Sequence, residues 1–332
     1  MVPTDSAAAS DAPILLVGGS GQVGWELRQS LPLLGPVVVA SRTPPAALRQ
    51  PEWQPIDMLN PESIRKAVRA VRPRLIVNAA AYTAVDRAEK QTEMAHAING
   101  EAPGILAEEA AELGAALVHY STDYVFDGSK ETPWTEDDEP RPLNVYGESK
   151  LAGERAVTAS KAPHLILRVS WVYGLNGGNF VKTMLHLAQT RTEIAVVDDQ
   201  VGAPTSAHTI AAATTFILAQ AGRDVAGYLR ERGGVYHLSC TGETSWCGFA
   251  RQIFEHRRQL CPALPVPKVQ AITTAEYPTP AARPMNCRLD TRRLRERFGL
   301  HLPRWEEALA PCLNVLLTER AETAVASSSK AA

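Results

Sequence analysis

The chain has 332 residues, of which 45% are hydrophobic, and its formal net charge is -2. A near-neutral charge does not favour a nucleic-acid partner, which requires a concentrated basic surface, and no apolar run reaches the roughly 18 to 20 residues of a membrane helix. We therefore expect a cytoplasmic protein without nucleic-acid or membrane partners, whose five cysteines are reduced thiols.

The first half of the sequence alternates short apolar runs with helical patterns. The apolar runs are 14–17, 37–40, 75–78, 116–120 and 165–169, and the helical patterns are 21–34, 63–71, 91–113 and 144–160. Apolar strands that alternate with helices are typical of a parallel sheet covered on both faces. The predicted fold class is therefore α/β, with a Rossmann-like doubly wound parallel sheet whose strands end at one common edge.

The alternation stops after residue 171. A Gly/Asn cluster follows at 174–179, and later come a strand at 194–197, a helix at 206–220, a strand at 235–238 and a Pro-rich stretch at 262–284. We expect a Rossmann domain over 13–171 with returning segments near 205–240. A smaller α/β substrate-binding domain is expected over 172–204 and 241–318, and disordered tails over 1–12 and 319–332.

Three glycines follow the first strand with the spacing G-x-x-G-x-x-G. Gly18 allows a tight turn, Gly21 allows backbone to approach a pyrophosphate, and Gly24 allows the next helix to pack on the strand. The N-terminus of that helix offers free N–H groups to phosphate. A strand before the glycines and a helix after them predict dinucleotide binding.

The ends of the next two strands bear on the choice of cofactor. Ser41 and Arg42 stand where a site specific for NAD usually carries an acidic residue, and a hydroxyl with a guanidinium suits the 2′-phosphate of NADP. Asp57 can accept from the adenine amino group. The simpler alternatives are a solvated surface arginine and a turn or cap carboxylate.

Tyr146 and Lys150 form a Y-x-x-x-K pattern in a predicted helix, so both side chains share one face. A nearby ammonium can lower the pKa of a phenol and make it a usable acid. Thr122 follows the strand that ends at Tyr120, and its hydroxyl can bond a substrate carbonyl or cap a turn. The three residues are candidates for acid–base catalysis.

Five segments carry a more specific pattern: 18–24 (GGSGQVG), 78–86 (NAAAYTAVD), 120–126 (YSTDYVF), 144–147 (NVYG) and 199–205 (DQVGAPT). Together they resemble the extended short-chain dehydrogenases and, more narrowly, the dTDP-4-dehydrorhamnose reductase family, over about residues 14 to 315. The resemblance implies reduction of the 4-keto group of dTDP-4-dehydro-β-L-rhamnose, the final step to dTDP-L-rhamnose. NADPH is the expected cofactor, with NADH as the alternative.

The resemblance also implies roles for individual residues. The catalytic set is Tyr146, Lys150 and Thr122. The substrate set is Thr122, Asp123, Tyr146, Trp171, Arg283 and Asn286, the last two toward the nucleotide diphosphate. With the residues already named, the expected cofactor site comprises Gly18, Gly21, Gln22, Val23, Gly24, Ser41, Arg42, Asp57, Met58, Ala79, Ala81, Tyr82, Thr83, Tyr146 and Lys150.

Magnesium and a homodimer are further implications of the resemblance. Glu26 matches an acidic position of the implied metal site, which is sometimes at a dimer interface, but His208 stands where a partnering glutamate is expected, which weighs against a metal-bridged dimer. Asp198 and Asp199 form another acidic pair, with a solvated loop as the simpler interpretation.

Two other functions remain open from the sequence. A relative of this fold is the non-catalytic regulatory subunit of methionine adenosyltransferase, although Thr122, Tyr146, Lys150 and Trp171 argue against that function here. A nucleotide-sugar epimerase or dehydratase is also compatible, because Asp123 lies beside Thr122.

Overall fold

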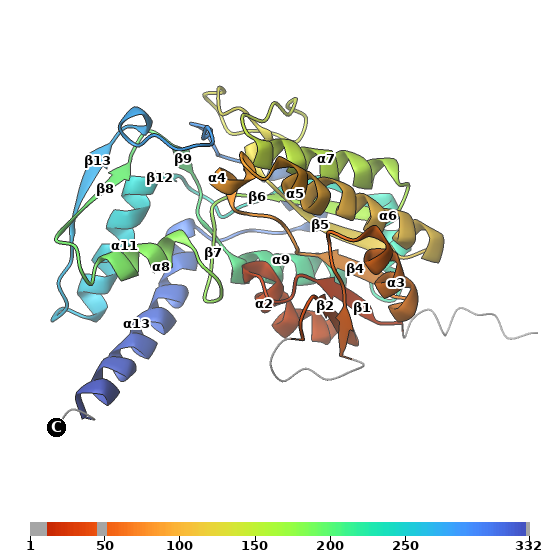
Figure 1. The fold of residues 1–332 in the computed structure, drawn as a ribbon, viewed down its shortest axis with the longest axis horizontal. Helices are drawn as coiled ribbons and strands as arrows, with labels where there is room; N and C mark the ends of the chain where they lie inside the picture. Colours follow the sequence, from red (N-terminus) through yellow and green to blue (C-terminus); the bar gives the residue numbers. More distant parts are fainter. Residues whose placement is uncertain (1–11, 45–51, 330–332) are drawn as a thin grey trace, which may run out of the picture.

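Seven parallel strands form the central sheet of the computed structural model, which describes residues 12–44 and 52–329 and the side chains of its last helix up to residue 318 (Figure 1). In spatial order the strands are β11 (Gly234–Leu238), β6 (His164–Val169), β5 (Ala116–Thr122), β4 (Leu75–Asn78), β1 (Ile14–Val17), β2 (Val37–Ser41) and β3 (Trp53–Pro55). The predicted doubly wound α/β fold is confirmed. The strand order reverses between β1 and β4, where such folds open a ligand crevice.

Helices cover both faces of this sheet (Figure 1). One layer contains α3 (Pro61–Val71), α6 (Ala102–Leu113) and α7 (Val145–Ala159), and the other contains α2 (Gln22–Ser30), α9 (Ala207–Ala219), α10 (Val225–Arg232) and α12 (Arg292–Phe298). Ile14 and Leu16 pack with Leu27 of α2, whereas Leu15 and Val17 pack in the cluster of the opposite face. Burial on both sides explains why the strands are apolar throughout.

A second hydrophobic core lies beside the sheet, on the left of Figure 1. Strand β8 (Glu193–Val197) pairs in parallel with β13 (Lys268–Ile272), and α8 (Phe180–Leu187), α11 (Trp246–Leu260) and α13 (Trp305–Ser329) pack against them. Short pairs complete this half, namely β7 (Val172–Tyr173) with β10 (Thr205–Ser206) and β9 (Val201–Gly202) with β12 (Thr244–Ser245). The predicted domain boundaries stay a prediction.

Two helices differ from the sequence-based expectation. The helix expected over 21–34 ends at Ser30, and Leu31–Leu34, which contains Pro32, forms a 3-10 turn. The helix expected over 91–113 is divided into α5 (Thr92–His96), a π-helical turn at Ala97–Glu101 and α6, following the short α4 (Val85–Ala88). Pro103 has no amide to donate to the carbonyl four residues earlier, which disfavours a regular helix there.

The chain end also differs from the expectation. A disordered tail was expected over 319–332, whereas α13 continues to Ser329 and only 330–332 lie outside the described residues. Alanine has the highest helix propensity, so an Ala-rich segment can extend a helix that packing has already formed. The other expected tail, 1–12, lies outside the description except for its last residue. Across the described ranges, no helix combines the length and apolar character needed to cross a membrane.

Candidate active site

A cavity of about 890 Å³ opens at the carboxyl edge of the sheet, where the strand order reverses. Small-molecule sites typically occupy about 300–1,000 Å³, so the space suits a large ligand or two ligands side by side. The turn after β1, the ends of β2, β4 and β5, the start of α7 and the loop at 177–179 line it, together with aromatic residues of the second core. The cavity therefore lies between the two halves of the molecule.

The glycine turn after β1 is tight for steric reasons. Gly18 has φ of +82°, and a Cβ on Gly24 would lie 2.1 Å from the Gly18 carbonyl oxygen. Gly18, Gly21, Gln22 and Val23 line the cavity, whereas Gly24 is buried behind them. The first turn of α2 contains no acidic residue, so its free N–H groups can donate to the oxygens of a phosphate.

The loop at 174–179 contacts the glycine turn from the other half of the chain. The Asn176 amide donates to the Ser20 carbonyl at 2.7 Å, and the Asn179 amide donates to the Gln22 side-chain oxygen at 3.0 Å. Asn179 also caps α8 by accepting from the Lys182 N–H. These bonds fix the position of the loop that closes the cavity over the glycine turn.

The side chains expected at the adenosine end all line the cavity, namely Ser41, Arg42, Asp57 and Met58. The Ser41 hydroxyl donates to the Thr43 carbonyl at 2.6 Å, and Arg42 is exposed. The Asp57 carboxylate accepts from the Leu59 N–H at 3.1 Å. Asp57 therefore stabilises a turn and lines the cavity, and the two interpretations made from the sequence coexist.

The segment after β4 is held by a residue that the sequence did not single out. Ala79, Ala81, Tyr82 and Thr83 line the cavity. Buried Asn99 accepts from the Tyr82 N–H at 2.7 Å, and its amide donates to the Tyr82 carbonyl and to the Ser149 hydroxyl, both at 3.0 Å. The sequence signal was an asparagine inside an Ala-rich helical run, and the structure shows that this asparagine is buried. Asn99 ties this segment to α7.

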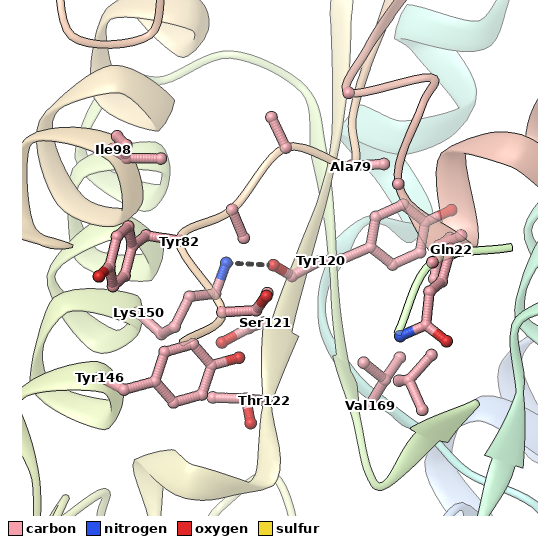
Figure 2. Close-up of a pocket in the computed structure, with 18 of the residues that line it drawn as sticks. Gln22, Ala79, Tyr82, Ile98, Tyr120, Ser121, Thr122, Tyr146, Lys150 and Val169 are labelled. Atoms are coloured by element: carbon pink, nitrogen blue, oxygen red, sulfur yellow. Dashed lines mark hydrogen bonds between the residues drawn. The ribbon is translucent and has the colours of Figure 1, made fainter. Parts of the chain in front are cut away.

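Tyr146, Lys150 and Thr122 meet at one wall of the cavity (Figure 2). Asn144 caps α7 by accepting from the Gly147 N–H at 2.8 Å, and Tyr146 and Lys150 follow one turn apart. The Lys150 ammonium nitrogen donates to the Tyr120 carbonyl at 2.5 Å. The Thr122 hydroxyl, at the end of β5, donates to Asp123 at 2.9 Å.

Burial dominates the electrostatics of this wall. It raises the pKa of Tyr146 to about 12, although a hydrogen bond with Thr122 lowers that pKa in part. It lowers the pKa of Lys150 to about 8, against the charge of Glu154. The expected lowering of the Tyr146 pKa by Lys150 is thus not observed, because the cost of burying a phenolate is larger.

Asp123 follows Thr122 in the chain, accepts from its hydroxyl and is 3% exposed. Burial raises its pKa to about 6, and hydrogen bonds with Cys287, Thr122 and Ser170 oppose that rise. Asp123 also lines the cavity. Its position beside Thr122 matches the sequence-based expectation, and its role in binding substrate stays a prediction.

Two tryptophans stack at the side of the cavity formed by the second core. The rings of Trp171 and Trp246 lie 3.6 Å apart and are inclined by 10°, and Phe180 packs against Trp246 at 4.7 Å. Trp171 is 7% exposed, so it belongs to the core as well as to the cavity wall. Trp246 was not predicted, because it lies 75 residues from Trp171 in sequence and only the fold joins them.

Arg283 and Asn286 lie outside the residues that line this cavity. The Arg283 guanidinium pairs with Asp86 at 2.8 Å. The Asn286 amide donates both hydrogens, to the carbonyls of Lys130 and Thr132 at 2.7 and 2.8 Å. Any contact of these two side chains with a nucleotide diphosphate would compete with those bonds.

Glu26 and His208 do lie together, with a carboxylate oxygen 3.2 Å from the imidazole Nδ1. Magnesium prefers several oxygen ligands, and within the described residues no group of three or more His, Cys, Asp or Glu could hold a metal. The Asp198 carboxylate accepts from the Ser245 hydroxyl, and Asp199 accepts from the Thr274 N–H at 2.9 Å. Within the described part of one chain, these residues therefore do not assemble a magnesium site.

Comparison with known proteins decides the family. The family model described as the RmlD substrate binding domain matches residues 12–318. The dTDP-4-dehydrorhamnose reductase of Escherichia coli K12 is 45% identical over 93% of this chain and 99% of its own length. The chain belongs to this family. The reductase of the same name from Burkholderia thailandensis is also 45% identical, over 92% of this chain and 99% of its own length.

Solved structures agree with the family. The crystal structure of dTDP-4-dehydrorhamnose reductase from Bacillus anthracis in complex with NADP has a TM-score of 0.78 and 34% identity, covering 91% of this chain and 98% of that one. The UDP-glucose 4-epimerase of Thermus thermophilus, in complex with NAD, has a TM-score of 0.71 at 18% identity, covering 91% and 98%. At 18% identity, the similarity to the epimerase shows only a shared fold.

Proposed function

We propose that this chain reduces the 4-keto group of dTDP-4-dehydro-β-L-rhamnose to give dTDP-L-rhamnose, with NADPH as the reductant. The observation that carries the proposal is the juxtaposition of Thr122, Tyr146 and Lys150 with the glycine turn across one cavity. Family membership and the reductase name of the similar proteins support the choice of substrate.

The residues at the glycine end fit a dinucleotide phosphate. The glycine turn and the N-terminus of α2 suit a pyrophosphate, and Ser41 with Arg42 suits a 2′-phosphate. The bound NADP of the Bacillus anthracis relative supports this assignment. NADPH, when bound, supplies the hydride for the keto carbon.

The residues at the α7 wall supply the proton and hold the developing charge. Negative charge builds on the carbonyl oxygen as the keto carbon is reduced, and a positioned donor stabilises it. Tyr146 is assigned as the acid, because its raised pKa keeps the phenol protonated at neutral pH. Thr122 orients the carbonyl, and cationic Lys150 anchors ribose hydroxyls of the cofactor.

The test is consumption of NADPH with freshly prepared dTDP-4-dehydro-β-L-rhamnose, with dTDP-glucose as the control that lacks a keto group. We expect turnover with the first compound and none with the second. An epimerase or a dehydratase would show no net NADPH consumption, and a regulatory subunit would show neither turnover nor a new sugar. Either outcome would contradict the proposal.

Arg42→Ala tests the choice of cofactor. The guanidinium is exposed at the cavity rim, where a 2′-phosphate would lie, and hydrogen bonds to charged groups contribute about 1.5–3 kcal/mol. We expect the KM for NADPH to rise about 10- to 100-fold, with little change for NADH. An equal change for both cofactors would show that Arg42 does not bind the 2′-phosphate.

Trp246→Leu tests the aromatic wall. Trp246 lines the cavity, and an aromatic contact between its ring and the sugar nucleotide would be worth about 0.5–1.5 kcal/mol, so the KM for the sugar nucleotide should rise about 2- to 12-fold. NADPH binding, measured by fluorescence, should stay within about twofold because the glycine turn is untouched. A larger loss of NADPH binding than of substrate binding would place the stack against the cofactor instead.

The remaining partner and location assignments belong to the same proposal. A dTDP-sugar is the small-molecule partner, and a cytoplasmic location fits an enzyme whose five cysteines are all free. A homodimer remains an expectation from the family resemblance, and sedimentation velocity would test it.

A further inference from the structure

A buried chain of hydrogen bonds runs from the segment after β4 to Lys150. The Ala80 N–H donates to the Asn78 side-chain oxygen at 3.2 Å, and the Asn78 amide nitrogen lies 3.1 Å from Nδ1 of His119. The His119 Nε2 lies 3.3 Å from Nζ of Lys150. Asn78 and His119 are 0% exposed and Lys150 is 1% exposed, so water does not compete for these groups.

The direction of each bond follows from the donors available. The Ala80 N–H can only donate, so the Asn78 oxygen faces it and the Asn78 nitrogen faces His119. An amide nitrogen has hydrogens and no lone pair to offer, so Nδ1 of His119 must accept. Burial, with the charge of Lys150 second, lowers the pKa of His119 well below its usual value, so the ring is neutral. Its single ring proton is therefore on Nε2, directed at Lys150.

An N–H directed at Nζ disfavours the ammonium form of Lys150. An ammonium group has three donors and no acceptor, and one of them already bonds the Tyr120 carbonyl. The neutral amine, in contrast, can accept from Nε2–H while still donating to that carbonyl. We propose that His119 is a positioning residue which sets the protonation equilibrium of the catalytic lysine through the Nε2–H tautomer imposed by Asn78.

Two other titratable groups near Lys150, Tyr146 and Glu154, do not disfavour its ammonium form. Tyr146 lies one turn earlier on α7 and is protonated, because burial raises its pKa to about 12. Glu154 lies one turn later and favours the ammonium form, but Arg168 of β6 pairs with it at 2.7 Å. Among these side chains, His119 of β5 is the one that opposes the ammonium form of Lys150, with Nε2 3.3 Å from Nζ.

The first test measures the tautomer directly and needs neither cofactor nor substrate. Long-range 1H–15N spectra of histidine-labelled full-length protein are recorded for the wild type and His119→Phe, and the resonances lost in the variant belong to His119. We expect a neutral ring with the proton on Nε2 at pH 7. A proton on Nδ1, or on both nitrogens, would overturn the proposal.

The second test rests on the proposed role of Lys150 in binding NADPH. Cationic Lys150 should hold the cofactor, so NADPH affinity should fall as pH rises through the lysine pKa of about 8. In His119→Phe the midpoint of that fall should move upward by about one pH unit, the equivalent of tenfold in the equilibrium. An unmoved midpoint in folded His119→Phe would overturn the proposal.

His237→Phe is the matched control, because His237 is also 0% exposed and neutral but lies against the Trp134 carbonyl and Arg168. The midpoint should not move in this variant. If His119→Phe fails to fold, Asn78→Asp replaces the donating nitrogen with an accepting oxygen, so the His119 proton should move to Nδ1 and the midpoint should again rise. Retention of the Nε2–H tautomer in Asn78→Asp would equally overturn the proposal, whereas absence of NADPH binding in the wild type would count only against the proposed function.

Discussion

Replacing Tyr146 with Phe should reduce the turnover number about 10²- to 10⁴-fold, which is the usual contribution of a positioned general acid. The change removes one hydroxyl from a ring that packs edge-on against Tyr124 at 5.7 Å, so the ring contacts survive. NADPH affinity and the unfolding temperature should stay close to the wild-type values. Steady-state kinetics, NADPH titration and thermal unfolding of the same preparation check the three expectations.

Tyr228→Phe is the matched control for loss of a phenolic hydroxyl, because Tyr228 lies on α10 and donates to Gln220 away from the cavity. Its turnover should equal that of the wild type. Near-normal turnover of a correctly folded Tyr146→Phe would contradict the acid assignment and favour the regulatory-subunit alternative.

The raised pKa of Tyr146 is consistent with this direction of reaction. A pKa of about 12 keeps the phenol in its acid form below that pH, and reduction of a ketone requires an acid. Lowering of the pKa by Lys150, as expected from the sequence, is needed mainly for the reverse reaction, in which a tyrosinate acts as base. As the pH rises, activity should therefore be lost first through deprotonation of Lys150, whose pKa is about 8. Deprotonation of Tyr146 should contribute only at higher pH.

Replacing Gly24 with Ala should destabilise the fold and abolish NADPH binding. The new Cβ would lie 2.1 Å from the Gly18 oxygen and 2.8 Å from the Gly19 Cα, so the backbone of the turn must move. Overpacking of this kind costs about 1–3 kcal/mol of unfolding free energy, and occasionally more. Denaturant unfolding measures the loss of stability, and a fluorescence titration with NADPH measures the loss of binding.

Gly21→Ala separates the two effects. Its Cβ would lie 3.4 Å from the Gly18 oxygen, an ordinary contact, but it would project at the cavity wall. Stability should stay near the wild-type value while NADPH affinity falls, because the methyl group occupies the space for the pyrophosphate. Equal stability losses in Gly21→Ala and Gly24→Ala would contradict the distinct roles assigned to the two glycines.

The sequence predicted the sheet well because each buried strand carries its own signal. Runs such as 14–17 and 75–78 are apolar on both faces, and the two hydrophobic clusters that cover them account for that pattern. The helix at 91–113 was predicted too simply, since Pro103 and the buried Asn99 interrupt it in ways that a composition average does not register. The C-terminal helix was missed because its Ala/Ser-rich end resembles a tail.

The site was predictable where function depends on a local pattern. The glycine spacing and the Tyr146–Lys150 pair are each contained in one turn and helix, and the structure places both at the same cavity. Trp246, Asn99 and His119 carry no such pattern, because each acts through a partner distant in sequence. For Arg283 and Asn286 a local resemblance suggested a contact with the nucleotide diphosphate, which stays a prediction, and the structure shows the tertiary partners that such a contact would have to displace.

The most direct test of the central claim follows the hydride itself. NADPH deuterated at both C4 positions of the nicotinamide is incubated with dTDP-4-dehydro-β-L-rhamnose and the full-length protein, and the sugar product is examined by NMR and mass spectrometry. The proposed function predicts dTDP-L-rhamnose that carries one deuterium at C4 of the sugar, formed in step with NADPH oxidation. A product without deuterium at C4, or an epimerised or dehydrated sugar formed without NADPH oxidation, would contradict it.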